Sequence, residues 1–514
     1  MRIAVVIALA AGGVLAPPAA SAAEGRPVPF GYMRMDAGGE VLATLPRDLD
    51  GDSLQDLAVV ARDSRGRRRL LVFYQRRGRG YTRAPDVSLD LGPGAAAVGA
   101  AARPGLEGAD LIALGPEGVM LFRNLGGRKF AAEAEVARAR TLVRAADPDQ
   151  MAIWSLVLDT NGDGFDEVLV PRRDGYAAVS PYGKGGGAVY PAPTREELLD
   201  LEGYLVAARV SFPTLWVADF DGDGKPKPGA RIKLPAAGPF DGARKDRRDD
   251  GKPGVWTWPL AGGEPSGRYA VPWSGTKGGT VARSGVSLVG DVDGDKRADL
   301  VEVTSSWDTR EPIVDIATSV TWRLNRRESP FSEKSGGRLA VAGVFLAGSL
   351  EDFDGDGRRD LVLVTVAKDI MSSVAALLAQ EVTVTFAVYE FREGRLAPDP
   401  VLRREFGFPF SFFDKAQMMP AWNFTGDFNG DGVRDLAMVH GSDGTDLYIT
   451  RRVKGPDGGP RYVVPAVGTF RAPVVPSSIL VADLNDDSVS DAVLLFPEIS
   501  PDRDKVVVIL SEVK

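Results

Sequence analysis

The chain of 514 residues has no cysteine and only one histidine, His440. Without cysteine it can form neither disulfides nor thiolate metal sites, and one histidine leaves little material for acid–base catalysis or a zinc centre. No Ser-His-Asp, zinc or phosphate-loop pattern is present either. These absences argue against an enzyme, and they require something other than disulfides to hold the loops.

The chain also lacks an apolar run long enough for a comfortable membrane span. Its first apolar stretch, from Ile3 to Ala16, follows Arg2 and precedes a group of small residues that ends at Ala23. This layout is typical of a cleaved secretory signal, which we assign to residues 1–23. We therefore expect a protein exported to the periplasm or the extracellular space, with no membrane span and as a monomer.

An excess of charge of one sign is missing as well. The formal net charge is −8, from 62 basic and 70 acidic residues, which gives no reason to expect nucleic-acid binding. The 60 glycines and 36 prolines indicate frequent chain reversals. Because residues 24–514 exceed what one ordinary core supports, we looked for internal repeats.

An acidic loop followed by an apolar run recurs along the chain. Six nearly intact copies are DLDGDSLQD from Asp48, DTNGDGFDE from Asp159, DVDGDKRAD from Asp291, DFDGDGRRD from Asp352, DFNGDGVRD from Asp427 and DLNDDSVSD from Asp483. A seventh, DFDGDGKPK from Asp219, has Lys227 where the last acid should stand, so we expect it to bind metal weakly or not at all. An eighth unit, around residues 102–110, keeps only the final acid, Asp110.

The spacing of these loops predicts the fold. The eight units begin about 54 to 75 residues apart, which suits a four-stranded unit with variable loops. The runs after the loops are rich in β-branched residues, as expected for strands. We therefore predict an all-β fold, a single β-propeller domain over residues 24–514 with four-stranded blades, eight in number, with seven as the alternative. One helical insertion is expected near residues 369–381.

The ends of the chain predict how the ring closes. After the last acidic loop, only two more strands fit before Lys514, so the final blade lacks its outermost strand. Residues around Pro27 to Met35 are expected to supply this strand. Pairing of the N-terminal strand with the last blade would leave no long exposed sheet edge.

The loops have the composition of a calcium site. Calcium takes six to eight oxygen ligands, and side chains at positions 1, 3, 5 and 9 of a tight loop can reach one centre, with a carbonyl at position 7. Glycines at positions 4 and 6 allow the positive φ that such a loop needs, and Asp486 and Ser488 depart from this rule in the last loop. One acidic turn would be weak evidence, but six in phase are strong. We expect about six calcium ions, with a seventh doubtful.

The candidate ligands share these loop positions. They are Asp48, Asp50, Asp52 and Asp56; Asp159, Asn161, Asp163 and Glu167; Asp219, Asp221 and Asp223; Asp291, Asp293, Asp295 and Asp299; Asp352, Asp354, Asp356 and Asp360; Asp427, Asn429, Asp431 and Asp435; and Asp483, Asn485, Asp487 and Asp491.

EF-hands are the competing interpretation, since they also place acids at positions 1, 3 and 5. They require a further acid at position 12 and flanking helices. Position 12 is an acid in one of the six copies, Glu302, and the flanking segments read as strands. The EF-hand interpretation is therefore disfavoured.

The loops and their strand context resemble FG-GAP or VCBS-type repeats, which form the propeller of integrin α subunits and of many exported bacterial proteins. The resemblance covers about Phe30 to Lys514. It implies a ring of four-stranded blades with calcium in the loop between the first two strands. This chain departs from the pattern around residue 102, at Lys227, and in lacking Gly-Ala-Pro after the second strand.

Two classes of function remain open. The first is a binding, adhesion or scaffold module, in which calcium is structural and one face of the ring or its inserts hold a protein or a glycan. The inserts are residues 240–254, 307–312, 369–381 and 408–419. The alternative is an extracellular carbohydrate-active enzyme, a polysaccharide lyase or hydrolase, but no catalytic carboxylate pair stands out.

Overall fold

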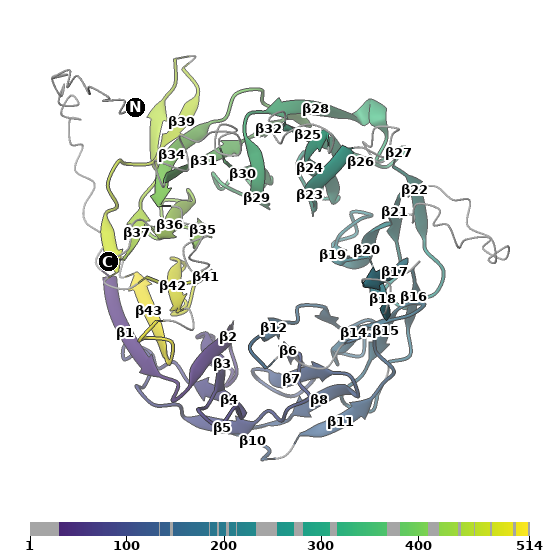
Figure 1. Ribbon diagram of the computed structural model, residues 1–514, viewed down its shortest axis with the longest axis vertical. Helices are drawn as coiled ribbons and strands as arrows, with labels where there is room; N and C mark the ends of the chain where they lie inside the picture. Colours follow the sequence, from purple (N-terminus) through teal and green to yellow (C-terminus); the bar gives the residue numbers. More distant parts are fainter. Residues whose placement is uncertain are drawn as a thin grey trace, which may run out of the picture.

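The computed structural model describes residues 30–511 except for 133, 144–147, 185, 193–194, 202–204, 212, 233–253, 272–280, 309–315, 367–380, 410–420, 440–443, 457, 473–474 and 497–499. Its strands form small sheets, antiparallel apart from the short β12, arranged in a ring (Figure 1). Eight of these sheets have four strands in the order of a propeller blade, and one of the eight carries a fifth strand. The predicted eight-bladed β-propeller is thereby confirmed, and the seven-bladed alternative is wrong.

The first four blades follow one another along the chain from β2 to β22. Blade 1 contains β2 (Glu40–Arg47), β3 (Asp56–Arg62), β4 (Arg68–Phe73) and β5 (Val87–Asp90). Blade 2 contains β6 (Ala97–Ala101), β7 (Asp110–Gly115), β8 (Gly118–Phe122) and β11 (Glu135–Arg138), with β12 (Ala152–Ile153) added beside β6. Blade 3 contains β13 (Val157–Leu158), β14 (Glu167–Arg172), β15 (Gly175–Val179) and β16 (Val189–Pro191). Blade 4 contains β19 (Leu215–Ala218), β20 (Lys227–Ile232), β21 (Gly254–Thr257) and β22 (Gly267–Ala270).

The other four blades complete the ring. Blade 5 contains β23 (Val281–Gly290), β24 (Asp299–Asp308), β25 (Ala317–Arg323) and β28 (Gly336–Val341). Blade 6 contains β29 (Val344–Glu351), β30 (Asp360–Val366), β31 (Glu381–Tyr389) and β34 (Leu402–Pro409). Blade 7 contains β35 (Trp422–Gly426), β36 (Asp435–Val439), β37 (Thr445–Tyr448) and β40 (Phe470–Ala472). Blade 8 contains β41 (Ser478–Ala482), β42 (Asp491–Leu495), β43 (Lys505–Ser511) and β1 (Phe30–Asp36).

Strand β1 closes the ring as the sequence predicted. It pairs antiparallel with β43 over its whole length, from Phe30 opposite Ser511 to Asp36 opposite Lys505. Figure 1 shows β1 lying on the outside of β43 and leading directly into blade 1. The last blade therefore takes its outermost strand from the beginning of the chain.

Short hairpins are inserted between the third and fourth strands of four blades. We call them the inserted hairpins: β9 (Asn124–Gly126) with β10 (Lys129–Phe130), β26 (Asn325–Arg326) with β27 (Ser329–Pro330), β32 (Phe391–Arg392) with β33 (Arg395–Leu396), and β38 (Arg451–Lys454) with β39 (Pro460–Val463). They belong to blades 2, 5, 6 and 7. A further hairpin, β17 (Arg195–Leu201) with β18 (Leu205–Ser211), connects blades 3 and 4.

The core lies between neighbouring blades. Second strands such as β3 and β30 are buried along almost their whole length because an adjacent blade covers each face. Alternate side chains of a strand therefore enter different apolar clusters; Val60 packs toward blade 2 and Val59 toward blade 8. This explains why the runs after the acidic loops are apolar at nearly every position rather than at every second one.

Other predictions fall partly or wholly outside the described residues. The signal sequence of residues 1–23 lies there, and so does the helical insertion near 369–381, except that Glu381 begins strand β31. Within the described part of the chain, the helical segment is a short 3-10 turn, η2 (Glu333–Ser335), and no helix there could cross a membrane.

Candidate functional site

The acidic loops occupy one place in the fold. Each lies between the first and second strands of its blade, so all of them emerge on the same face of the ring. Strands rather than helices flank them, which excludes EF-hands. Loop positions 4 and 6 have positive φ, as at Gly355 (76°) and Gly357 (85°). Asp486 (61°) and Ser488 (66°) adopt the same conformation, so the last loop keeps the backbone of the others despite lacking glycine.

The position-1 carboxylate organises each loop. Asp159 accepts hydrogen bonds from the backbone N–H groups of Gly162 (2.7 Å) and Gly164 (2.8 Å). Asp219 and Asp427 do the same at nearly identical distances with the residues three and five positions further on. The turn is therefore held by its own first side chain.

Neighbouring loops are also joined to each other. The backbone N–H of Ala298 in blade 5 donates to the carbonyl of Asp219 in blade 4 at 2.7 Å. Equivalent bonds run from Arg359 to Asp291 (2.9 Å) and from Ser490 to Asp427 (2.7 Å). The conformation of one acidic loop is thus coupled to the packing of the next blade.

The position-9 carboxyl has a structural role that the sequence did not reveal. Asp299 is fully buried and accepts hydrogen bonds from the backbone N–H of Val292 (3.0 Å) in its loop and of Asn325 (2.7 Å) after the third strand. Asp435 makes the same pair of contacts in blade 7. Burial raises the pKa of Asp299 to about 8, so this carboxyl is costly to ionise unless a cation lies beside it.

The predicted ligands converge in some loops more than in others. Three carboxylates offer oxygens within 4.8 Å of one another in four loops: Asp48, Asp50 and Asp56; Asp219, Asp221 and Asp223; Asp291, Asp293 and Asp295; and Asp352, Asp354 and Asp356. In the loops at 159, 427 and 483, position 3 is asparagine, and its amide nitrogen donates to the position-5 carboxylate at 3.0 to 3.2 Å. These three loops would have to turn that amide to offer oxygen to a metal ion.

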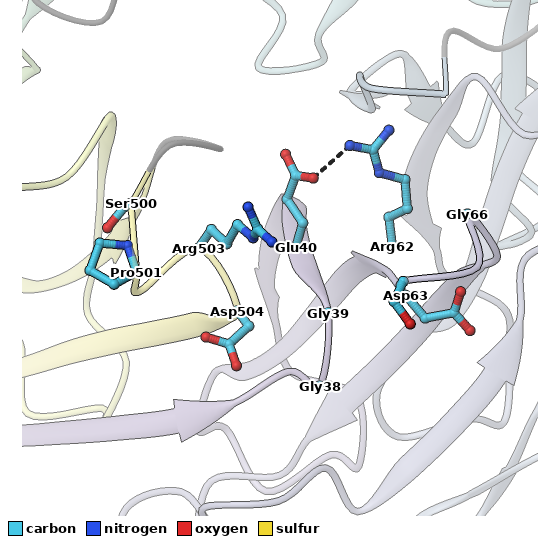
Figure 2. Close-up of a pocket in the computed structure, with 11 residues that line it drawn as sticks. Gly38, Gly39, Glu40, Arg62, Asp63, Gly66, Ser500, Pro501, Arg503 and Asp504 are labelled. Atoms are coloured by element: carbon cyan, nitrogen blue, oxygen red, sulfur yellow. Dashed lines mark hydrogen bonds and ion pairs between the residues drawn. The ribbon is translucent and has the colours of Figure 1, made fainter.

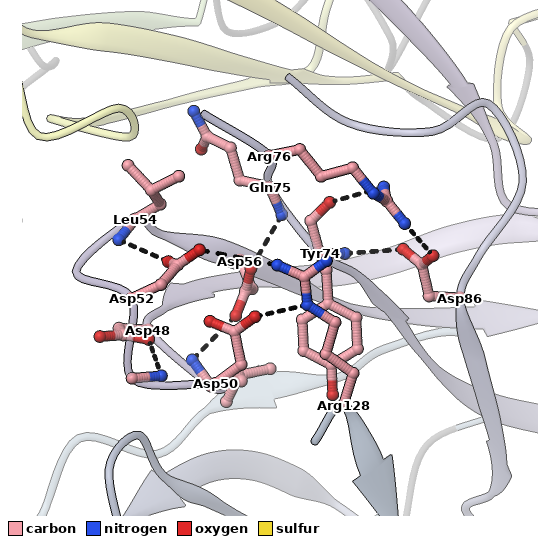
Figure 3. Close-up of polar contacts among 12 residues, drawn as sticks. Asp48, Asp50, Asp52, Leu54, Asp56, Tyr74, Gln75, Arg76, Asp86 and Arg128 are labelled. Atoms are coloured by element: carbon pink, nitrogen blue, oxygen red, sulfur yellow. Dashed lines mark hydrogen bonds and ion pairs between the residues drawn. The ribbon is translucent and has the colours of Figure 1, made fainter. Parts of the chain in front are cut away.

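The loop of blade 1 is partly covered by the next blade. Figure 3 shows Arg128, from the inserted hairpin of blade 2, lying against Asp50, with Nε 2.6 Å from the carboxylate. The same guanidinium lies over the ring of Tyr74. The Asp50 side chain is only 8% exposed, and its Oδ1 atom is buried without a hydrogen-bond donor. The sequence pattern did not identify Arg128 or Tyr74 as neighbours of this loop.

In blades 2 and 4, a basic side chain of the same blade pairs with the acids at the loop. In blade 4, Nζ of Lys227 lies 2.5 Å from Asp221 and 2.6 Å from Asp223. In blade 2, Nε of Arg103 lies 2.8 Å from the buried carboxylate of Asp110. In both blades a side chain of the protein neutralises the acids.

Replacing Lys227 with an acid should therefore create a metal site. In Lys227→Asp, the carboxylates of Asp221 and Asp223 lose their ammonium partner and gain a position-9 acid, so we expect one more bound calcium ion per chain by equilibrium dialysis. Lys225→Asp is the matched control, because this exposed lysine has the same charge change two residues away. Equal calcium stoichiometry in the two variants would contradict the assignment of Lys227 as the blade's cation.

A polar pocket lies on the opposite face, where blade 1 meets blade 8. This closure pocket of about 880 Å³ is lined by Gly38, Gly39, Glu40, Arg62, Asp63, Ser64, Gly66, Ser500, Pro501, Arg503 and Asp504. Glu40 begins β2 and Arg62 ends β3, at the other end of these strands from the acidic loop. Figure 2 shows their side chains facing each other, joined by an ion pair of 2.6 Å. Arg62 also pairs with Asp149.

Several tryptophans and arginines of the chain are engaged in the fold. The tryptophans Trp256, Trp258 and Trp322 are buried, and Trp258 is fully so. Within the arginine-rich segment of blade 1, Arg67 and Arg76 pair with Asp63 and Asp86. Of the inserts, residues 240–253, 309–312, 369–380 and 410–419 lie outside the described part of the chain.

Comparison with known proteins adds little to this picture. No family model matches the chain, and no curated protein matches it. Among solved structures, one similar chain is a lectin of Agrocybe aegerita, described as specifically recognising non-reducing terminal N-acetylglucosamine; it is 16% identical, the match covers 71% of this chain and 80% of that one, and the TM-score is 0.35. A likeness at this level carries no ligand over to this chain.

Proposed function

We propose that this chain is an exported, calcium-stabilised β-propeller of the FG-GAP or VCBS type that acts as a binding, adhesion or scaffold module. The observation that supports calcium most directly is the set of buried carboxylate oxygens without donors in two acidic loops: Oδ1 of Asp50, of Asp352 and of Asp354. Oδ2 of Asp50 pairs with Arg128, but a buried carboxylate oxygen without a donor is still destabilising, and a cation at the centre of the loop removes this cost.

Calcium is the cation that these loops fit best. Their side-chain donors are carboxylate and amide oxygens, with no cysteine or histidine among them, which disfavours zinc and copper. The loop offers several carboxylate or amide oxygens and backbone carbonyls, the larger oxygen set that calcium takes and magnesium, which keeps several waters, does not need. Extracellular modules with such sites need only about 10⁻⁴–10⁻³ M calcium, so an exported protein would hold its ions constantly.

A structural role for the metal leaves the opposite face for recognition. The closure pocket lies on that face and offers guanidinium, carboxylate and hydroxyl groups, a mixture suited to a polar segment of a protein or to a glycan. We therefore place the partner at the closure pocket. The acidic loops support the ring and do not catalyse a reaction.

The test is a pull-down from envelope extract with immobilised protein, run beside a glycan array. Ser64→Arg should abolish capture because Ser64 is exposed and the larger cation fills the closure pocket. Ser329→Arg, an equally exposed serine in the inserted hairpin of blade 5, should leave capture unchanged. Equal capture by both variants would exclude the pocket, and cleavage of acidic polysaccharides by the wild-type protein would replace this proposal with the enzyme alternative.

A further inference from the structure

Blade 6 brings a carboxylate to its acidic loop from outside that loop. Glu390 directly follows strand β31. Leu361 pairs with Tyr389 across the sheet, so Glu390 lies opposite Asp360, where the acidic loop enters the second strand. A side chain from the third strand thus stands at the end of the blade that holds the predicted metal ligands.

The two oxygens of Glu390 have different surroundings. Oε2 accepts hydrogen bonds from Nε (2.9 Å) and Nη2 (2.7 Å) of Arg392, a residue of the inserted hairpin. Oε1 is buried and has no hydrogen-bond donor, and the residue as a whole is 8% exposed. Arg392 therefore fixes one side of the carboxylate and leaves the other side available for a ligand.

The loop beside it shows the same deficit of positive charge. Oδ1 of Asp352 and Oδ1 of Asp354 are likewise buried without a donor. The other oxygen of Asp354, Oδ2, has the uncharged hydroxyl of Tyr462 3.4 Å away. Arg358, a residue of the loop itself, pairs with Asp356 at the exposed side.

No equivalent carboxylate exists in six other blades. In each blade, loop position 10 pairs with a residue near the end of the third strand, and the position of Glu390 is the next one along the chain. In blades 1, 2, 3, 5, 7 and 8 this next residue is Tyr74, Arg123, Ser180, Leu324, Ile449 and Leu510, respectively. Glu390 is therefore a particular feature of blade 6 and not part of the repeat.

We propose that Glu390 is an additional ligand of the divalent cation in blade 6, so that this loop is the tightest metal site of the ring. This inference rests on the proposed calcium function. Its physical basis is that one more carboxylate oxygen joins the coordination shell, and ligand charge is a main determinant of calcium affinity. The ion would also connect the first-to-second-strand loop of the blade with its third strand.

The experiment combines calcium titration by calorimetry with melting curves in calcium and in chelator. Glu390→Gln should weaken the tightest site by about tenfold or more, a change of about 1.4 kcal/mol. In chelator the variant should melt at or above the wild-type temperature, because an unpartnered buried charge has been removed. Glu393→Gln is the control; this glutamate is exposed and three residues away, in the turn of the same hairpin.

A second variant separates metal binding from a structural ion pair. Arg392→Gln removes the partner and keeps the carboxylate, so calcium affinity should be maintained or increased. If Glu390→Gln and Arg392→Gln both lower the melting temperature equally in calcium and in chelator, Glu390 is only the partner of Arg392 and the inference is wrong. If the wild-type chain melts identically with and without calcium, the proposed function itself fails.

Discussion

Removal of calcium is expected to lower the melting temperature of the protein by roughly 10 °C. At a calcium concentration ten times the dissociation constant, each site contributes about 1.4 kcal/mol, so six sites contribute about 8 kcal/mol. For a chain of this length the melting temperature shifts by about 1–2 °C per kcal/mol. The effect should extend over the whole ring, because backbone hydrogen bonds connect one acidic loop with the next, as from Ala298 to Asp219.

Differential scanning calorimetry in calcium and in a chelator measures this directly. Magnesium at the same concentration is the control for ionic strength, and it should restore much less stability. Identical melting curves in calcium and chelator would exclude a metal role for the loops.

Metal binding should reduce the dependence of stability on pH. Burial raises the pKa of Asp299 and Asp360 to about 8, from an ordinary value of 3.8. A group whose pKa is raised in the folded state contributes stability below its unfolded pKa, and that stability is lost as the pH rises through the folded pKa. In chelator the protein should therefore lose stability between pH 4 and pH 8. Calcium favours the ionised form and should offset this loss.

Replacement of a position-9 acid should be the most damaging single substitution in a loop. Asp299→Ala leaves the buried N–H groups of Val292 and Asn325 without acceptors, so we expect a loss of about 3 kcal/mol or more in the free energy of unfolding. This loss should appear in chelator as well as in calcium, because the two hydrogen bonds do not need the metal.

Asp295→Ala in the same loop is the matched comparison. Asp295 is exposed and accepts the backbone N–H of Arg297, so its removal should cost little in chelator and lower stability only in calcium. Urea unfolding followed by circular dichroism gives both values. Equal losses for the two variants in chelator would refute the structural role of the position-9 carboxyl.

The order of strands in each blade could be predicted because the repeated sequence pattern specifies it. Each acidic loop marks the turn between two strands, so seven such loops and one unit that keeps only Asp110 predicted eight blades, and the apolar runs after Asp56 and Asp360 indeed form second strands. Closure could also be predicted, because a final blade with three strands leaves an open edge that the N-terminal segment can cover.

The surroundings of the loops could not be predicted in the same way. Arg128 reaches Asp50 from the next blade, and Tyr462 approaches Asp354 across another blade boundary. Such contacts depend on how blades stack, and loop spacing alone does not specify this. The prediction for Asp299 was also incomplete, because it named this residue only as a metal ligand. Its second hydrogen-bond partner, Asn325, lies beyond the third strand and could not be found from the loop pattern. Calcium binding itself stays a prediction.

The pairing of β1 with β43 makes the ring depend on two segments at opposite ends of the described chain. If β1 is displaced from β43, the backbone groups of β43 are exposed along a full strand edge. The same strand of another molecule can then occupy that edge, and its own vacant edge can accept a third molecule. Loss of this one pairing would therefore convert a closed ring into the unit of a head-to-tail polymer by strand exchange.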